Sequence, residues 1–426
     1  AGPRTASEFS LARMVRSWYK SSIIMQPKGK NMLCPDRLNP HDFPSPCFVT
    51  DLAKLEKNMQ ILNSVQKKTG AKILLALKGF AQWKSFPYLS RAMQGPLFGA
   101  CASSVDEARL SKEEFKGEVH AFAAGFSDED MRELLTLCDH ITFNSINQWK
   151  KFRPVISEYN EKHEKKILCG LRINPEHSEG AVPIYDPCSP SSRLGIRLKD
   201  FENENLDELF DGLTGLHFHT LCEQNSDALD RTLRAVEEKF AFMLERVSWV
   251  NFGGGHHITR EDYDIDLLCQ CIERIQAKYP VQIYLEPGEA VALKAGYLIS
   301  TVLDVIHADM PMAILDTSAA CHMPDVLEMP YRPAITGSGE EYEKKFTYRL
   351  GGKSCLAGDV VSTYSFDTPL KEGDKLVFED MAIYSMVKTT TFNGLRLPSI
   401  ALWDSRTNEI LAVKHFGYGD FKERLS

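Results

Sequence analysis

The sequence predicts an α/β protein with a (β/α)8 barrel of the TIM type, followed by a C-terminal β-rich domain built as a small barrel or sandwich. With 426 residues the chain is too long for one hydrophobic core, so we expect two domains. Between residues 72 and 286, eight apolar runs alternate with helical patterns, as in such a barrel. A doubly wound open sheet would produce the same alternation, but the count of eight favours the barrel.

One short strand and one helix precede the predicted barrel. The strand covers 47–50, and Asp51 then caps a helix that runs towards Lys68 with leucines and a methionine on one face. The barrel strands are the apolar runs at 72–78, 97–102, 119–123, 140–144, 166–174, 213–220, 247–252 and 282–286. Helical patterns lie between most of them, for example at 105–114, 128–137, 228–245 and 263–277.

The pattern changes at about residue 298, where amphipathic helices become rare. Strand-like runs separated by Gly, Pro and Asp turns follow, among them 297–308, 313–315, 347–350, 375–379 and 401–403. We therefore divide the chain into a flexible tail or expression remnant (1–31), a leading strand that joins the β-rich domain (32–50), the barrel (51–295) and the β-rich domain (296–426). Residues 175–190, with four prolines, form a predicted surface loop.

Composition limits the classes of partner. The formal charge of −8 argues against nucleic acid, which binds basic surfaces. No apolar run approaches the ~20 residues that span a bilayer, so we expect no membrane partner. Eleven cysteines lie scattered without a repeated spacing, which favours free thiols and a cytoplasmic location.

Chemically versatile residues follow four of the predicted barrel strands. Active sites of such barrels lie at the carboxyl ends of the strands, so these residues should meet at one mouth. Two histidines separated by one residue also point to the same side of their strand. The residues are Lys78 after the first strand, His217 and His219 in the sixth, Gly253, Gly254 and Gly255 after the seventh, and Glu286 with Gly288 after the eighth.

Together these residues meet the chemical needs of pyridoxal 5′-phosphate. A partly desolvated lysine such as Lys78 can form a Schiff base with an aldehyde. The backbone of a glycine run can approach a phosphate closely. A histidine can stack on the pyridine ring, and Glu286 opposite the ring nitrogen would keep that nitrogen protonated.

Each feature also has an ordinary explanation when taken alone. A strand-end lysine often extends to water, a glycine run is often only a turn, and paired histidines usually belong to the core or rim. Finding all of them at strand ends of one predicted barrel is much harder to explain by chance. His256 and His257 follow the glycines, but no carboxylates have ligand spacing around them, so we expect no metal site.

The ordered set of motifs resembles the fold-type III pyridoxal-phosphate decarboxylases, which include the ornithine and diaminopimelate enzymes. The likeness spans most of the chain. The motifs are Ala-Leu-Lys (76–78), Gly-Leu-His-Phe-His (215–219), Asn-Phe-Gly-Gly-Gly (251–255), Glu-Pro-Gly (286–288), Cys-Leu-Ala-Gly-Asp (355–359) and Thr-Phe-Asn-Gly (391–394).

Several departures resemble the branch of this family that decarboxylates carboxynorspermidine or carboxyspermidine. Glu289 replaces the usual arginine after Glu-Pro-Gly, and Leu-Cys-Glu-Gln (221–224) replaces the usual Gly-Ser. The segments 171–176, 192–195 and 316–325 add to the likeness. The departures put in doubt any phosphate contact that relatives make through that arginine or serine.

The resemblance implies a role for each matched residue. Lys78 would hold the cofactor aldehyde, His219 would stack on its ring, and Glu286 would pair with its nitrogen. The glycine run, Gly288 and Tyr384 would hold the cofactor, and Cys355 would return a proton after carbon dioxide leaves. Asp316, Asp359 and His217 would contact the polyamine substrate. The implied assembly is a homodimer whose cysteine loop reaches the other subunit's site.

Alternatives stay open at this point. Another decarboxylase of the same fold, acting on diaminopimelate, ornithine or arginine, would share most of these motifs. A racemase is disfavoured, because racemases of this fold pair the ring nitrogen with arginine. A catalytically silent regulator is disfavoured too, because both Lys78 and Cys355 are present.

Overall fold

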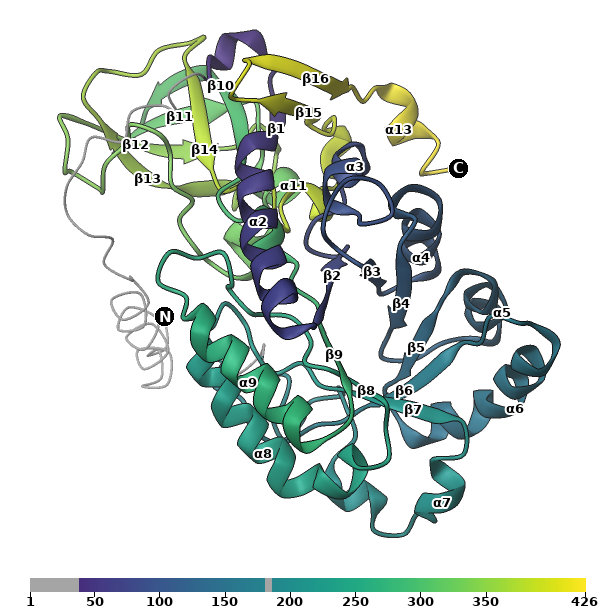
Figure 1. Ribbon diagram of the computed structural model, residues 1–426. Helices are drawn as coiled ribbons and strands as arrows, with labels where there is room; N and C mark the ends of the chain where they lie inside the picture. The colour runs from purple at the N-terminus through teal and green to yellow at the C-terminus, as the bar shows by residue number, and fades with distance from the viewer. Residues whose placement is uncertain (1–37, 181–185) are drawn as a thin grey trace, which may run out of the picture.

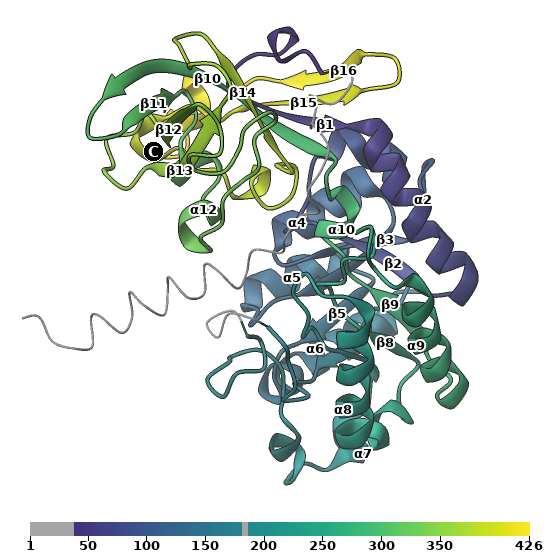
Figure 2. The ribbon, with the colours of Figure 1, turned by 90° about the vertical axis from the view of Figure 1, so that its left-hand side faces the viewer.

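The computed structural model describes residues 38–180 and 186–426, which form two parts (Figures 1 and 2). The lower part in both views is the parallel barrel, and the upper part is a mixed β-sheet with long loops. The predicted tail, 1–31, and residues 181–185 of the predicted loop lie outside the described residues.

The first part is a closed barrel of eight parallel strands, which confirms the predicted fold class. Each strand pairs with the next in the chain, and the last pairs with the first, so that Lys72 lies opposite Tyr284. The strands are β2 (Lys72–Ala76), β3 (Gly99–Ala102), β4 (Glu118–Phe122), β5 (His140–Phe143), β6 (Leu168–Arg172), β7 (Leu213–His217), β8 (Trp249–Asn251) and β9 (Gln282–Leu285).

Helices cover the outside of the barrel (Figure 1). Side-chain caps set several starts, such as Asp51 accepting from the Ala53 N–H and Ser127 in a capping box with Asp130. The helices are α2 (Leu52–Thr69), α3 (Phe86–Leu89), α4 (Val105–Leu110), α5 (Asp128–Leu137), α6 (Ile146–Lys162), α7 (Leu206–Leu209), α8 (Ser226–Leu244), α9 (Ile265–Lys278) and α10 (Glu289–Ala292).

The second part is a mixed sheet in which an early strand pairs with late ones. β1 (Cys47–Asp51) lies between β10 (Gly296–His307), antiparallel to it, and β15 (Ser399–Asp404), parallel to it. The other strands are β11 (Pro311–Leu315), β12 (Phe346–Gly351), β13 (Val360–Phe366), β14 (Lys375–Glu379) and β16 (Glu409–Lys414). The helices here are short: α11 (Ala319–His322), α12 (Asp325–Glu328) and α13 (Tyr418–Lys422).

Several elements are shorter than their apolar patterns predicted. The pairing of β7 with β8 ends at His217 and Asn251, so His219 lies beyond the ladder, and Lys78 lies in the turn after β2. The predicted helix 105–114 ends as α4 at Leu110 and continues as one π-helical turn. An apolar run predicts burial, whereas the end of a strand depends on where its neighbours stop.

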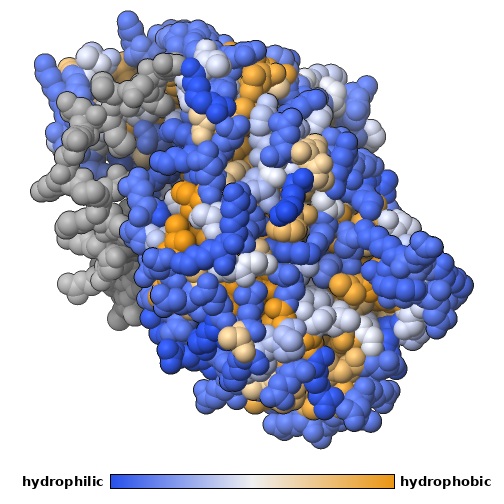
Figure 3. Space-filling view, in the orientation of Figure 1, coloured by the Kyte–Doolittle hydropathy of each residue, from blue (hydrophilic) through white to orange (hydrophobic). Residues whose placement is uncertain are grey.

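No helix of the described chain is long and apolar enough to cross a membrane. On the face shown in Figure 3, hydrophilic residues cover most of the surface, and hydrophobic residues show in small separate groups. All ten cysteines in the described part are free, and the cytoplasmic location stays a prediction.

A tryptophan fills the inside of the barrel where two strands carry glycine. A Cβ atom at Gly215 would lie 1.8 Å from the Trp249 ring, and one at Gly170 would lie 2.4 Å from it. Trp249 also donates its indole N–H to Thr214 Oγ1 at 3.0 Å, which fixes the ring. Because Gly170 and Gly215 have no side chains, they leave the room in which the indole ring packs.

We expect the Gly215→Ala substitution to destabilise the protein by about 1–3 kcal/mol, because the rigid interior cannot take an added methyl group. The measurement is urea unfolding followed by circular dichroism. Gly125→Ala is the matched control, since a Cβ there meets nothing within 4 Å, and it should stay within about 0.5 kcal/mol of wild type. Equal stability of both variants would contradict this account of the barrel interior.

Candidate active site

Lys78 lies at the mouth of the barrel, in the turn that follows β2. A Cβ atom on the next residue, Gly79, would lie 3.0 Å from the Cα of Gly288, so this turn packs on the Glu-Pro-Gly turn after β9. The Ala76 N–H also donates to the Pro287 carbonyl (3.2 Å). The predicted partial desolvation of Lys78 is not seen, because its side chain is exposed.

Glu286 is an ionised carboxylate held by the two strands before its own. The Asn251 amide donates to Oε1 (2.6 Å), and His217 Nε2 lies 3.3 Å from Oε2. Burial opposes ionisation of Glu286, but the two partners outweigh it and keep its pKa below the ordinary value. Burial lowers the pKa of His217, while the charge of Glu286 and the contact with it act in the opposite direction.

His219 has a fixed protonation state as well as a fixed position. The Gly254 N–H donates to His219 Nδ1 (2.8 Å), so Nδ1 is the acceptor and the proton lies on Nε2. Burial holds the pKa of His219 well below its ordinary range, and the charge on Lys78 acts in the same direction. A neutral, oriented ring therefore faces the mouth.

The three glycines allow the loops after β7, β8 and β9 to pack together. A Cβ atom at Gly253 would lie 2.4 Å from the carbonyl oxygen of Phe218, in the loop after β7. A Cβ at Gly254 would lie 2.6 Å from the carbonyl oxygen of Glu286, after β9, and a Cβ at Gly255 would lie 2.0 Å from the carbonyl oxygen of Leu221. Gly253 and Gly255 also have φ angles of 71° and 80°, which favour glycine.

The backbone donors of this loop differ in their availability. The Gly253 N–H donates to Asn251 Oδ1 (2.9 Å), and the Gly254 N–H is engaged by His219. Within the described residues, the N–H groups of Gly255 and His256 have no acceptor, while the Gly255 carbonyl accepts from Gln224 (3.0 Å). The donors open to an anion are therefore those of Gly255 and His256.

Tyr384 brings the β-rich domain to the mouth. It has a φ angle of 53°, and its N–H donates to the Gly79 carbonyl at 2.9 Å, one residue from Lys78. Its side chain packs against the barrel core, and burial raises the pKa of its hydroxyl, which stays protonated. Tyr384 and Lys78 therefore belong to one rigid junction.

Carboxylates gather beside the glycine loop. Glu223, His257 and Glu289 place their polar atoms within 4.8 Å of one another, and His257 Nε2 lies 3.2 Å from Glu289 Oε2. Along the chain no carboxylate has ligand spacing around His257, but the fold places two beside it, and the expected absence of a metal there stays a prediction. The β7–α8 loop and α10 bring Glu223 and Glu289 to it across long sequence separations.

The structure does not bring the other predicted residues to this mouth within one chain. Cys355 is exposed on the β12–β13 loop, and its N–H donates to Asn393 Oδ1 (2.8 Å). Asp359 accepts from Ser354 and from the N–H groups that start α11, while Asp316 accepts from Ser300 and Thr301. Both aspartates are buried and stabilise the β-rich domain, and their predicted contact with substrate stays a prediction.

Two residues that support the site had no role in the sequence analysis. Asn251 orients Glu286 and fixes the glycine loop, and Arg172 donates to the His219 carbonyl (3.2 Å) while lying 4.7 Å from the Phe122 ring centre. Burial lowers the pKa of Arg172 to about 10, so its charge persists. Asn251 lies in the Asn-Phe-Gly-Gly-Gly motif and Arg172 in the segment 171–176, and both residues end a barrel strand. That position at a strand end is the feature of the sequence that could have indicated a role in the site.

A family of known sequences matches most of the chain. The family described as "Pyridoxal-dependent decarboxylase, C-terminal sheet domain" matches residues 47–382. The carboxynorspermidine/carboxyspermidine decarboxylase of Campylobacter jejuni is 43% identical over 89% of this chain and 98% of its own length. The carboxyaminopropylagmatine decarboxylase of Synechocystis sp. is 42% identical over 93% of this chain and 98% of its own.

Solved structures agree with the architecture. The carboxynorspermidine decarboxylase of Campylobacter jejuni in complex with norspermidine superimposes with a TM-score of 0.80 at 40% identity, covering 90% of this chain and all of its own. The diaminopimelate decarboxylase of Helicobacter pylori with L-lysine gives 0.73 at 17% identity, covering 90% and 97%. The second likeness supports the fold alone.

We expect the acidic side of the mouth to make stability depend on pH through Asp380. Burial, followed by the charge of Glu289, raises the pKa of Asp380 to about 6, although Oδ1 accepts the Lys294 N–H at 2.6 Å. Between the unfolded pKa and about 6 the native state binds the extra proton, so stability falls as pH rises.

Relative to Asp380→Asn, the wild type should therefore lose about 1 kcal/mol of unfolding free energy between pH 5 and pH 7, measured by urea unfolding. Asparagine keeps the acceptor oxygen and removes the titration. Asp309→Asn, at an exposed position, is the control and should track the wild type. If the free energies of unfolding of wild type and Asp380→Asn differ by the same amount at pH 5 and at pH 7, the raised pKa is not that of Asp380.

Proposed function

This chain belongs to the pyridoxal-dependent decarboxylases, and from that premise we propose that it removes the α-carboxylate of carboxynorspermidine or carboxyspermidine. The products are carbon dioxide and norspermidine or spermidine. The observation that carries the proposal is the 43% identity to a relative of that activity over 98% of the relative's length. The more distant diaminopimelate decarboxylases, such as that of Buchnera aphidicola at 24% identity, share less of the chain.

The residues at the mouth fit pyridoxal 5′-phosphate, which the family implies. Lys78 offers an exposed amine for the aldehyde, and the N–H groups of Gly255 and His256 offer free donors for the phosphate. Glu286 offers an ionised carboxylate for the pyridine nitrogen. When bound, the cofactor supplies a ring that accepts the electron pair left by departing carbon dioxide.

The chain's own residues keep that ring in its reactive state. Asn251 and His217 stabilise the charge of Glu286, so the carboxylate can hold a proton on the ring nitrogen. His219, oriented by the Gly254 N–H, would offer the flat face of its imidazole to the pyridine ring. Tyr384, held to Gly79, closes the mouth on the side of the β-rich domain.

The charge around the mouth suits a polycationic substrate. Burial raises the pKa of Glu107, but the charge on Lys78 opposes this rise, so both groups lie near the same opening. Glu223, Glu289 and Asp380 add further acidic groups beside the glycine loop. Ammonium groups on a polyamine chain would relieve the repulsion among these carboxylates.

Cys355 completes the proposed reaction from a second copy of the chain. Its loop makes no hydrogen bond or ion pair with the barrel in the part of the chain that the structure describes. Leu356 on the same loop and Phe392 beside it are 44% and 48% exposed, an apolar surface suited to a partner subunit. In the proposed homodimer the Cys355 thiol returns the proton to the substrate carbon.

A second substrate deserves the same test, because the Synechocystis sp. relative at 42% identity acts on carboxyaminopropylagmatine. That substrate ends in a guanidinium group rather than an ammonium group. The acidic residues beside the glycine loop would accept either cation.

The deciding experiment compares carbon dioxide release from carboxynorspermidine, carboxyspermidine, carboxyaminopropylagmatine and diaminopimelate by the purified holoenzyme. We expect kcat/KM to be greatest for carboxynorspermidine or carboxyspermidine, and lower by about tenfold or more for diaminopimelate, which lacks the longer cationic chain. Preference for carboxyaminopropylagmatine would select the second candidate. Preference for diaminopimelate would overturn the proposal.

Lys78→Ala should abolish covalent attachment of the cofactor, because no other described amine lies in the turn after β2. The measurement is borohydride reduction followed by intact-mass analysis, which needs no substrate. Lys84→Ala is the matched control, at a nearby exposed lysine, and should be labelled like wild type. A borohydride-fixed cofactor mass on Lys78→Ala equal to that on wild type would disprove the role of Lys78.

A further inference from the structure

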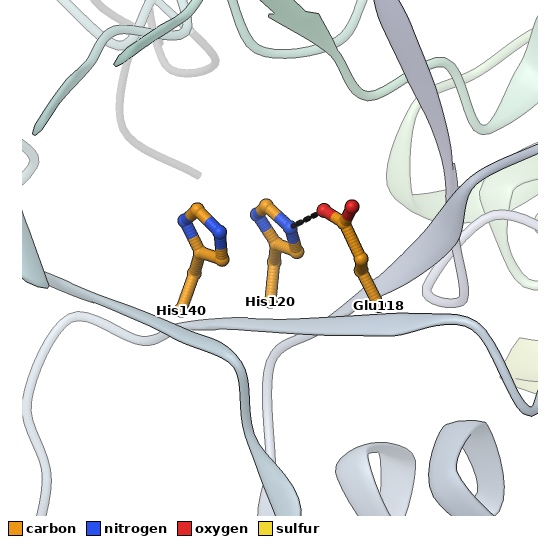
Figure 4. Close-up of side chains that lie close together, drawn as sticks. All are labelled: Glu118, His120 and His140. Carbon is orange, nitrogen blue, oxygen red and sulfur yellow. Dashed lines mark hydrogen bonds and ion pairs between the residues drawn. The ribbon is translucent and has the colours of Figure 1, made fainter. Parts of the chain in front are cut away.

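The amino-terminal end of the barrel holds a second group of polar side chains, away from the mouth. Glu118 begins β4 and His120 follows it on the same side of the strand, while His140 begins β5. The register pairs His120 directly with His140, so both rings enter the barrel at one level. We call these three residues the floor cluster, and Figure 4 shows them side by side on one side of the strands.

The donor atoms of the floor cluster already lie close together. The imidazole rings of His120 and His140 stack with centroids 3.9 Å apart and planes within 9°. His120 Nε2 lies 3.1 Å from Glu118 Oε2, and one donor atom from each of the three residues falls within a 4.8 Å span. Two imidazoles and a carboxylate form a ligand set that zinc prefers.

His140 is a buried polar group without a hydrogen bond. Its exposure is 5%, and its Nδ1 has no partner in the described chain. A buried nitrogen without a partner costs stability, and a ligand at the floor of the barrel would lower that cost if it reached this ring.

The neighbouring side chains contact the floor cluster directly and fix its position. Tyr284 donates its hydroxyl to Glu118 Oε2 (3.2 Å), and Lys72 contacts the other oxygen, Oε1. The rings of Trp249 and Tyr284 lie 5.0 and 5.4 Å from His140, which closes the inner side. Lys72 has a quarter of its side chain exposed, so it can extend to solvent from the outer side.

We propose that Glu118, His120 and His140 form a binding site for a divalent transition-metal cation of the zinc class at the floor of the barrel. Nitrogen ligands disfavour magnesium and calcium, which prefer oxygen. Metal–nitrogen bonds of about 2.0–2.1 Å require the two rings to tilt towards each other and His120 to carry its proton on Nδ1. The ion ties β4 to β5 and stabilises the barrel without taking part in the reaction.

The second group with similar residues, at the mouth, does not carry the same inference. There His257 lies 3.2 Å from Glu289 through Nε2, which makes no hydrogen bond within the described chain, and 3.4 Å from Arg260 through Nδ1. It lies beside the glycine loop and belongs to the site described above. A substitution in this mouth group therefore serves as the control for metal binding outside the floor cluster.

The test uses the holoenzyme, stripped with a chelator and then titrated with Co²⁺ and with Zn²⁺. Visible absorption of Co²⁺ reports the ligand geometry, and metal counting after dialysis reports the number of ions for each chain. The variants are Glu118→Gln and His140→Asn within the cluster, Lys72→Met beside it, and Glu289→Gln and His163→Asn as controls. Circular dichroism and cofactor absorption check that each variant is folded.

We expect one ion for each chain, with a four-coordinate spectrum that lacks thiolate charge-transfer bands. Glu118→Gln and His140→Asn should each weaken metal binding by more than ~100-fold. Substitution of a residue that only hydrogen-bonds to a ligand typically weakens metal binding by ~10–100-fold, and these two residues are ligands themselves. Lys72→Met should tighten binding about tenfold, because it removes a competing ammonium. Glu289→Gln and His163→Asn should bind as wild type does.

Absence of a stoichiometric ion on the wild type would overturn the proposal and leave the cluster as a polar plug of the barrel floor. Wild-type affinity in Glu118→Gln would overturn it as well. If His140→Asn does not fold, Glu118→Gln and Lys72→Met still decide, since a plug without a metal site gives no tighter binding when Lys72 is removed.

Discussion

An ionised carboxylate at the mouth of the barrel is the constraint on which the rest of the site depends. Glu286 is charged in a partly buried position because three consecutive strands each contribute one group at the same level. The register that pairs His217 with Asn251, and Asn251 with Tyr284, places both partners beside Glu286. A shift of one residue in any of these strands would turn a partner away and leave the charge without compensation.

The same strand ends explain the glycine run. Asn251 both orients Glu286 and accepts from Gly253, and His219 accepts from Gly254, so one network sets the carboxylate and the loop together. That network uses two of the loop's donors and leaves those of Gly255 and His256 open. Anion binding and carboxylate orientation are therefore coupled through shared side chains rather than arranged separately.

The two domains meet where the chain enters and leaves the barrel. The Asp51 N–H donates to the Ala295 carbonyl (2.7 Å), and β1 pairs with β10, so both ends of the barrel are anchored in one sheet. Tyr384 adds the contact to Gly79, which fixes the β-rich domain beside Lys78. The mouth and the floor then differ in kind: loops from both domains shape the mouth, while strand residues alone line the floor.

The amino-acid sequence by itself determined the class of fold and the location of the chemistry. Alternating apolar strands and helices encode a barrel locally, and Lys78, His219 and Glu286 stand at strand ends in any barrel built from them. Their motifs also indicated the family.

Only the tertiary structure decided which groups meet and which are already engaged. The pairing of neighbouring barrel strands set Asn251 and His217 on Glu286, packed Trp249 over two glycines, and brought Glu118 and His120 beside His140. It also showed that Asp359 caps α11. These contacts join residues far apart in the chain, and their geometry follows from strand register and loop packing, which no local pattern of residue types encodes.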